Sequence, residues 1–176
     1  VHEGGIGTPL VAHWPKGIAP QLRGKFEHQP AHLIDLMATC VDLGRAEYPM
    51  VAIGQKIVPM QGVSLKPAFS GKRLGRENPI FWEHEGNRAI RIGKWKLVAK
   101  GANGAWELYD LDTDRTELYD LSGQHPDKVK TMANEWFEWA EKVDRLRGKA
   151  LAPVQQRITP LDFRRDTTSG DYQKTP

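Results

Sequence analysis

The most regular pattern of apolar positions in the chain predicts a long helix near its C-terminal end. Between Pro126 and Arg147, apolar residues return at alternating steps of three and four, as they do on one face of an α-helix. The stripe consists of Val129, Met132, Trp136, Trp139, Val143 and Leu146, with Phe137 and Ala140 widening it. Pro126 is a residue typical of a first helical turn. Because the stripe carries two tryptophans and a phenylalanine, we expect this helix to cover a sheet.

Short apolar runs between turn residues predict an antiparallel sheet in residues 79–121. The expected strands are 80–82, 88–92, 94–98 and 106–109, and glycine-containing turns separate them. We expect a meander with one packed face and one face in water. The sequence Glu-Leu-Tyr-Asp-Leu occurs at 107–111 and again at 117–121, and each copy is expected to bury its Leu and Tyr.

The N-terminal part predicts a strand followed by a helix. Residues 8–14 form an apolar run that ends at Trp14-Pro15, which is typical of a buried strand. From Ala31 onward the period changes to that of a helix, and Gly44 stands where a left-handed residue commonly ends one. The apolar face of this helix contains Leu33, Leu36, Met37 and Cys40. Cys40 is therefore expected to be buried.

Proline spacing and composition divide the rest of the chain. Residues 46–78 form a long connecting segment with several prolines, and Val63 to Phe69 are expected to make one short helical turn. Residues 79–147 make up the sheet-plus-helix domain. After Gly148 the apolar pattern fades, so residues 148–176 are expected to be a polar tail.

Composition excludes several classes of protein. The 176 residues are 39% hydrophobic and 27% charged, which is ordinary for a globular protein. The net charge is only +3 with the signs interspersed, so we expect no nucleic-acid partner. The apolar runs are far shorter than the roughly 20 residues that span a bilayer, so we expect no membrane span. The chain opens on Val1-His2-Glu3-Gly4-Gly5 without an initiating Met or a leader, which favours a fragment of a longer protein.

Four blocks of sequence resemble the type I sulfatases, the arylsulfatase family of the alkaline-phosphatase-like superfamily. Residues 3–10 are similar to the family's Glu-Gly-Gly-x-Arg-x-Pro pattern, which is followed by a strand and Trp-Pro-Gly. The block 32–39 resembles its Asp-Leu-x-Pro-Thr helix, and 62–67 its Gly-x-Ser-Leu-x-Pro. Residues 81–97, followed by 106–111, resemble the closing sheet of bacterial arylsulfatases. The order and spacing of the blocks carry the resemblance.

The resemblance implies a fold and a place within it. It implies an α+β fragment of an α/β alkaline-phosphatase-like fold, in which a four-stranded antiparallel sheet packs on the long C-terminal helix. Residues 1–45 would be the edge of the large α/β domain, whose missing N-terminal part would be the partner of this chain. The parent enzyme would hydrolyse small-molecule sulfate esters, and export to the periplasm or outside the cell is usual for the family.

The catalytic groups that the family uses do not occur in this chain. Such enzymes use a formylglycine made from the Cys or Ser of a Cys/Ser-x-Pro-x-Arg motif, and a calcium ion held by carboxylates and an amide. Cys40 is followed by Val41-Asp42-Leu43, and Pro-x-Arg, Asp-Asp and Asp-Asn occur nowhere. Gly7 also stands where the family pattern has Arg. We therefore expect no catalytic residue, no metal ligand and no bound cofactor here, and no turnover by this segment alone.

The best cluster of polar residues lies around the turn at 83–88. His84, Asn87 and Arg88 are expected to border the substrate pocket and to meet the substrate beyond its sulfate. The competing interpretation is a solvated hairpin in which Arg88 pairs with Glu83 or Glu85. The alternating Asp110, Asp112 and Asp114 lack the later residues of a calcium loop and are expected to form a solvated turn. Trp95 between Lys94 and Lys96 is interpreted as a core aromatic.

Two other functions remain open at this stage. The first is a related hydrolase of the same superfamily that acts on phosphate or phosphonate esters. The second is a binding or assembly module without chemistry, which exposed side chains of Trp136, Phe137 and Trp139 would favour.

Overall fold

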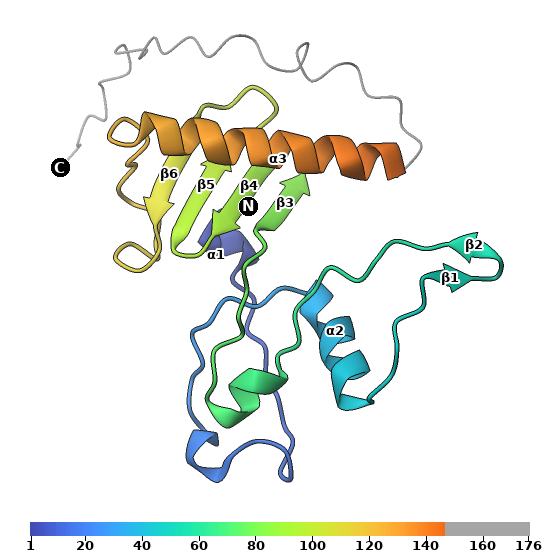
Figure 1. Cartoon of the computed structure of the whole chain (residues 1–176). Helices are drawn as coiled ribbons and strands as arrows, with labels where there is room; N and C mark the ends of the chain where they lie inside the picture. Colours follow the sequence, from blue (N-terminus) through green and yellow to red (C-terminus); the bar gives the residue numbers. More distant parts are fainter. Residues whose placement is uncertain (147–176) are drawn as a thin grey trace. The chain divides into compact units, whose positions relative to one another are not determined.

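The computed structural model describes residues 1–146 and divides them into two compact units (Figure 1). The first unit joins Val1–Gly4 to the chain from Phe81 onward, and the second comprises Gly5–Ile80. The expected polar tail, 148–176, lies outside the described residues. None of the helices within residues 1–146 combines the length and the apolar character needed to cross a membrane.

The first unit contains a four-stranded antiparallel meander in the order β3-β4-β5-β6. The strands are β3 (Ile80–His84), β4 (Asn87–Ile92), β5 (Trp95–Ala99) and β6 (Trp106–Asp110). Ile90 pairs with Leu97, and Leu97 pairs with Leu108, so three buried aliphatic residues form a row across the sheet. The predicted sheet is confirmed.

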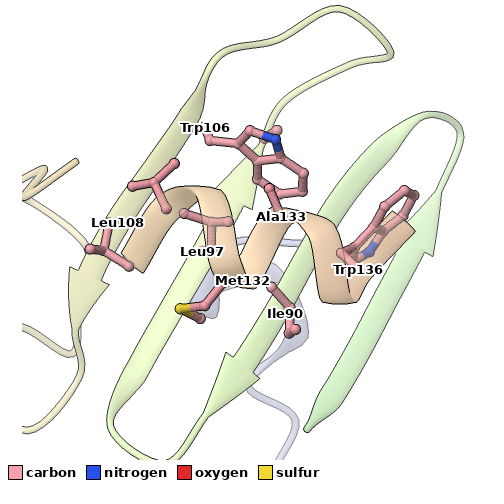
Figure 2. Close-up of a cluster of buried hydrophobic side chains, with 9 residues drawn as sticks. Ile90, Leu97, Trp106, Leu108, Met132, Ala133 and Trp136 are labelled. Atoms are coloured by element: carbon pink, nitrogen blue, oxygen red, sulfur yellow. The ribbon is translucent and has the colours of Figure 1, made fainter. Parts of the chain in front are cut away.

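Helix α3 (Pro126–Leu146) lies across one face of this sheet (Figure 1). Its Met132, Ala133 and Trp136 pack on the aliphatic row, as Figure 2 shows, and all of them are buried. Burial of each large side chain contributes roughly 1.5–3 kcal/mol. Trp136 also donates a hydrogen bond from Nε1 to the carbonyl of Trp82 in β3 at 3.1 Å. The prediction that the aromatic helix covers the sheet is confirmed.

The opposite face of the sheet is also covered, which differs from the expected face in water. Ala89, Val98 and Tyr109 are buried there, and Val1 and Trp82 pack against them. The expectation fails because charged residues that alternate with apolar ones indicate a solvent-facing side of a sheet only when no other part of the protein pairs with those charges. Lys96 lies on this face, completely buried between carboxylates.

The second Glu-Leu-Tyr-Asp-Leu copy does not bury the Leu and Tyr that correspond to Leu108 and Tyr109. Leu118 is 70% exposed and Tyr119 is 71% exposed, whereas Leu108 and Tyr109 of the first copy are buried. The backbone N–H groups of Leu118 and Tyr119 donate to the carboxylate of Asp114 at 2.8 and 2.9 Å. The second copy is therefore part of a turn organised by Asp114, and the prediction of two equivalent copies is wrong.

The second unit has few regular elements. They are α2 (Ile34–Leu43), the hairpin of β1 (Val51–Ala52) and β2 (Gln55–Lys56), and the short helices η1 (Pro20–Leu22) and η2 (Lys66–Ser70). A further short helix, α1 (Glu3–Ile6), begins in the first unit. The helical turn expected within 63–69 corresponds to η2. Residues 8–14 are not a buried strand: Val11 is exposed, and within residues 1–146 no strand pairs with this segment.

Helix α2 forms where the sequence predicts a helix, but the other face is buried. Asp35, Ala38 and Thr39 are buried, whereas Leu33, Leu36, Met37 and Cys40 are exposed. The polar face binds the segment before η2: Thr39 Oγ1 accepts the N–H of Leu65 at 2.8 Å. The left-handed residue after the helix is Arg45 (φ 50°), since Gly44 keeps a helical φ of −75°. The predicted burial of Cys40 is wrong.

Candidate functional site

The turn between β3 and β4 carries the residues that the sequence singled out. Glu85 and Gly86 both have positive φ angles, 51° and 83°, as the central residues of a tight two-residue hairpin require. A Cβ at Gly86 would lie 3.1 Å from the backbone nitrogen of Ala102, so the loop after β5 approaches this turn closely. Glu83 accepts the N–H of Gly86 through Oε1 at 3.1 Å. The hairpin is thus fixed by its own side chains.

His84 and Asn87 meet at this turn, and both polar groups of Asn87 are used there. The Asn87 amide donates from Nδ2 to the carbonyl of His84 at 2.8 Å, and its Oδ1 accepts the N–H of Gly101 at 3.0 Å. Asn87 therefore ties the hairpin to the loop after β5. The side chain of His84 is exposed at the end of β3.

Arg88 points to the side of the sheet that α3 covers. It is 8% exposed, and its guanidinium carbon lies 4.9 Å from the ring centroid of Trp106 and 5.9 Å from those of Trp136 and Phe137. Nη2 donates to the carbonyl of Gly104 at 3.1 Å, and within residues 1–146 the guanidinium forms no ion pair. Burial lowers the pKa of Arg88 from its ordinary value. The pairing with Glu83 or Glu85 that the competing interpretation required does not occur within residues 1–146, and Arg88 is buried whereas His84 is exposed.

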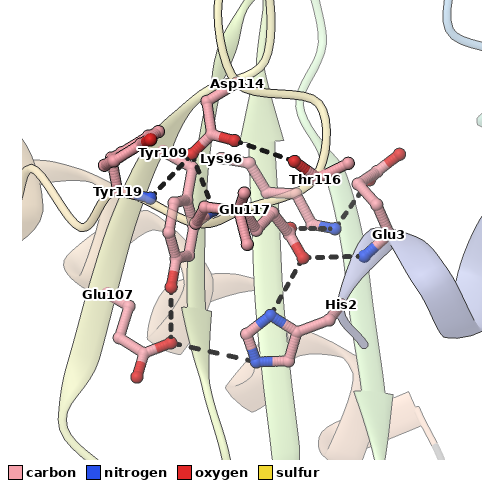
Figure 3. A network of polar contacts seen from close by, with 10 residues as sticks. His2, Glu3, Lys96, Glu107, Tyr109, Asp114, Thr116, Glu117 and Tyr119 are labelled. Atoms are coloured by element: carbon pink, nitrogen blue, oxygen red, sulfur yellow. Dashed lines mark hydrogen bonds and ion pairs between the residues drawn. The ribbon is translucent and has the colours of Figure 1, made fainter.

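A second polar cluster, which the sequence did not indicate, lies on the opposite face of the sheet (Figure 3). The ammonium of Lys96 is 2.6 Å from Glu3 Oε1 and 2.7 Å from Glu117 Oε1. Lys96 is fully buried, and only 2% of the Glu117 side chain is exposed. Glu117 Oε2 also accepts the backbone N–H of Glu3 at 2.8 Å. Two carboxylates and one ammonium thus fix the N-terminal residues on the sheet.

His2 extends this cluster toward solvent. Its Nδ1 lies 2.9 Å from Glu117 Oε2, and its Nε2 lies 3.8 Å from Glu107 Oε2, so both ring nitrogens face carboxylates. Tyr109 donates its hydroxyl to Glu107 at 2.9 Å. Burial, with this hydrogen bond adding to it, raises the pKa of Tyr109, so the phenol remains protonated. The cluster holds charge in place.

The second unit has a buried charge centre of its own around Asp35. Its carboxylate accepts the N–H of His32 at 2.7 Å and that of Val63 at 2.9 Å, and it forms an ion pair with Arg76. Asp35 is fully buried. Burial lowers the pKa of His32. Asp35 therefore links the start of α2 to two segments that follow it far along the chain.

The residues described do not fit a resident metal ion or a formylglycine. Within residues 1–146, no three His, Cys, Asp or Glu side chains are grouped so that they could hold a metal ion. Asp110 is buried and paired with Lys94 at 2.6 Å, whereas Asp112 is exposed, so the expected solvated turn is wrong for Asp110 and correct for Asp112. Cys40, the one cysteine of the chain, lies exposed in α2 without the Pro-x-Arg sequence after it.

Comparison with known proteins shows that most of the chain matches one protein family. The family described as "N-sulphoglucosamine sulphohydrolase, C-terminal" matches residues 1–149. The chain is 30% identical over 143 residues to an uncharacterized sulfatase of Schizosaccharomyces pombe, covering 78% of this chain and 25% of that protein. It is 28% identical over 140 residues to arylsulfatase K of Xenopus laevis, covering 75% and 25% respectively.

A solved structure resembles the chain in three dimensions as well. The crystal structure of Ps i-CgsB in complex with k-i-k-neocarrahexaose matches it with a TM-score of 0.57 and 26% identity, covering 72% of this chain and 27% of that one. The chain thus spans about a quarter of the length of these curated and solved relatives.

Proposed function

Since the chain belongs to the sulfatase family as its C-terminal domain and has part of an alkaline-phosphatase-like fold, we propose that it supports the active site of a sulfuric ester hydrolase. In this proposal the nucleophile and the metal ligands belong to polypeptide outside residues 1–176. The single observation that carries it is the match of residues 1–149 to a sulfatase C-terminal family.

The exposed apolar surface of the second unit supports the partner in this proposal. Most of the exposed large apolar side chains among residues 1–146 lie within Gly5–Ile80. Large exposed apolar surfaces on soluble proteins commonly mark interaction sites. Leu33, directly before α2, and Leu36 and Met37 within it form the exposed stripe. We assign this stripe to contact with the large α/β domain of the parent sulfatase. The relatives are long enough to contain such a domain, since this chain covers only about a quarter of their length.

The hairpin between β3 and β4 is the part of this chain that we assign to the substrate. His84 is exposed and free to meet the substrate beyond its sulfate. Asn87 and Arg88 act as positioning residues, because their polar groups bind the backbone of residues 84, 101 and 104. This division refines the expectation that all three residues contact the substrate.

Calcium and formylglycine belong to the parent enzyme in this proposal. The described residues of this chain offer neither three grouped His, Cys, Asp or Glu side chains that could hold a metal ion nor a Cys in the required motif. Calcium would supply charge neutralisation for the sulfate oxygens, and no step of that chemistry runs through residues described in this chain.

The test compares the full-length gene product with residues 1–176 alone. We expect the full-length protein to hydrolyse 4-methylumbelliferyl sulfate and the chain alone to show only background at high concentration. A second assay uses k-i-k-neocarrahexaose, the compound crystallised with Ps i-CgsB. His84→Ala in the full-length protein should raise KM with little change in stability, with Glu85→Ala as the matched control on the same turn.

Other outcomes would overturn the proposal. Turnover by residues 1–176 that a substitution within them abolishes would place the chemistry in this chain. Hydrolysis of p-nitrophenyl phosphate or a phosphonate ester, without hydrolysis of sulfates, would show the related phosphate or phosphonate hydrolase. A full-length protein inactive on all of these esters would favour a binding module. Exposure of Trp136 was a condition that would have favoured this function, and Trp136 is buried.

A further inference from the structure

A pocket of about 520 Å³ lies at the N-terminal end of α3, away from the hairpin assigned to the substrate. It is formed within the first unit by the β4–β5 turn and the first turns of the helix. Its volume is in the range of ordinary small-molecule sites. The apolar part of its wall consists of Ile92, Trp95 and Met132.

Trp95 is the aromatic centre of this pocket. Lys128 Nζ lies 4.8 Å from its ring centroid, and the His125 ring packs edge-on against it at 5.2 Å. Lys94 also lies over the indole at 4.9 Å, but its ammonium is paired with Asp110 and does not line the pocket. The interpretation of Trp95 as a core aromatic is therefore incomplete: it packs against the core and also lines an open pocket.

Lys128 is the cation that the pocket leaves available. It is half-buried and forms no ion pair or hydrogen bond within the described residues 1–146. Within residues 1–146 its ammonium contacts the Trp95 ring by a cation–π interaction. An ammonium in this position can bind an anionic group by a charge-assisted hydrogen bond.

The remaining polar wall restricts the kind of anion. Asp127 and Glu135 also line the pocket, and they would repel a ligand with several negative charges. Their carboxylates can accept hydrogen bonds from neutral hydroxyl groups, and Thr131 offers a further hydroxyl. A bare inorganic anion satisfies Lys128 but fills little of the pocket. A ligand with one anionic group, several hydroxyls and an apolar C–H face satisfies all three parts of the wall.

We propose that this pocket binds a sugar unit with a single anionic group, sulfate or carboxylate. The anionic group binds Lys128 and His125, the hydroxyls donate to Asp127 and Glu135, and the C–H face of the ring packs on the Trp95 side. The inference does not rest on the proposed function, because a binding site here is independent of where hydrolysis takes place.

The test is isothermal titration calorimetry of the full-length protein with four probes. They are N-acetylglucosamine 6-sulfate, glucuronic acid, glucose and sodium sulfate. We expect one or both anionic sugars to bind at least ten-fold more tightly than glucose and sodium sulfate, since one charge-assisted hydrogen bond corresponds to about ten-fold in affinity. The anionic sugar that binds more tightly identifies sulfate or carboxylate as the recognised group. Glucuronic acid has no sulfate ester, so its binding is measured without hydrolysis.

Three variants connect the binding to this pocket. Lys128→Met should weaken the anionic sugar about ten-fold, whereas Lys130→Met, which removes an exposed lysine two positions along the same helix, should not. Glu135→Ala should weaken the sugar but not sodium sulfate. Hydrolysis of 4-methylumbelliferyl sulfate, measured on the same preparations, should be unchanged in all three.

The opposite results would overturn the inference. Equal affinity for sodium sulfate and the sugars would indicate a simple anion site, and tighter binding by Glu135→Ala would indicate a more highly charged ligand. Unchanged sugar affinity in Lys128→Met would place binding elsewhere. A wild-type protein that binds the anionic sugar but does not hydrolyse aryl sulfates would count against the proposed function and would leave the inference about the pocket intact.

Discussion

Lys96 and Glu3 lie 93 positions apart in the chain and form an ion pair with 2.6 Å between Nζ and Oε1. Glu117 closes the arrangement from the other side, and its backbone adopts a left-handed φ of 58° that is uncommon for a residue other than glycine. The N-terminal residues are therefore an integral part of the sheet unit, held by ion pairs to a lysine that is completely buried.

Lys96→Met should destabilise the sheet unit strongly. The substitution keeps the length of the side chain but leaves the carboxylates of Glu3 and Glu117 without their cation in a buried site. Breaking a buried ion pair in this way costs about 3–5 kcal/mol. Denaturant unfolding of the full-length protein, followed by circular dichroism, measures the effect.

Two controls accompany this prediction. Lys94→Met removes the neighbouring lysine, whose side chain is 44% exposed, and should change the unfolding midpoint much less. Adding Glu3→Gln and Glu117→Gln to Lys96→Met should restore part of the lost stability, because no buried charge then remains unpaired. A Lys96→Met protein as stable as the wild type would contradict the assignment of this cluster.

The two faces of α2 should respond in opposite ways to substitution. Asp35→Ala removes the acceptor of two backbone N–H groups and the partner of Arg76, so we expect loss of the local structure of Gly5–Ile80. Met37→Glu, on the exposed apolar face, should leave that structure intact while weakening contact with the large domain. Limited proteolysis within Gly5–Ile80 reports the first effect.

The second effect of this pair is measured on co-expressed parts. Residues 1–176 are produced together with the polypeptide that precedes them, and co-purification of the two parts is compared for wild type and Met37→Glu. Lys56→Glu, a charge change at an exposed lysine of β2 in the same unit, serves as the control. If Met37→Glu co-purified with the preceding polypeptide as well as the wild type does, the docking role of the stripe would be contradicted.

Sequence periodicity correctly predicted the buried face of the elements that pack against partners in the same unit. The stripe on α3 and the strand alternation of β4, β5 and β6 meet one another, so the pattern and the burial agree. On α2 the apolar stripe is equally regular, yet the described chain buries Asp35 and Thr39 in its place. Periodicity shows that a face is apolar, but it does not show which polypeptide covers it.

The polar clusters were harder to predict for a related reason. Lys96 alternates with apolar residues as a solvent-facing lysine does, and only the fold brings Glu3 and Glu117 to it. Arg88 was identified as notable, but its burial against Trp106 depends on where α3 lies. The tight turn at Glu85-Gly86, a local property, was the part of the candidate site that the sequence did indicate.

Arg88→Lys should lower stability even though it preserves charge. Lysine lacks the planar guanidinium that packs on three aromatic rings and donates to Gly104, so we expect a loss of about 1–2 kcal/mol. Arg91→Lys on the same strand is the matched control, because Arg91 is half-exposed and should tolerate the change. Thermal unfolding compares the two, and equal midpoints would contradict a positioning role for Arg88.

The ion pair of Lys94 and Asp110 should make the stability of the sheet unit depend on pH at both ends of the range. The hydrogen bond from Lys94 lowers the pKa of Asp110 below its ordinary 3.8, and the same bond raises the pKa of Lys94 above its ordinary 10.5. A lowered carboxyl pKa contributes stability above pH 3.8, which is lost as the pH falls through the folded-state value. A raised lysine pKa contributes stability below pH 10.5, which is lost as the pH rises through the folded-state value.

Asp110→Asn should therefore lower the thermal midpoint most between about pH 5 and pH 9, and the difference from the wild type should shrink toward pH 2. Lys94→Met should show the same window, and the double variant should lose little more than either single one, because both remove one interaction. Asp112→Asn provides the control, since its carboxylate forms no ion pair within residues 1–146. If Asp110→Asn lowered the midpoint equally at pH 2 and pH 7, the stabilisation would come from the shape and backbone hydrogen bonds of the Asp110 turn rather than from its charge.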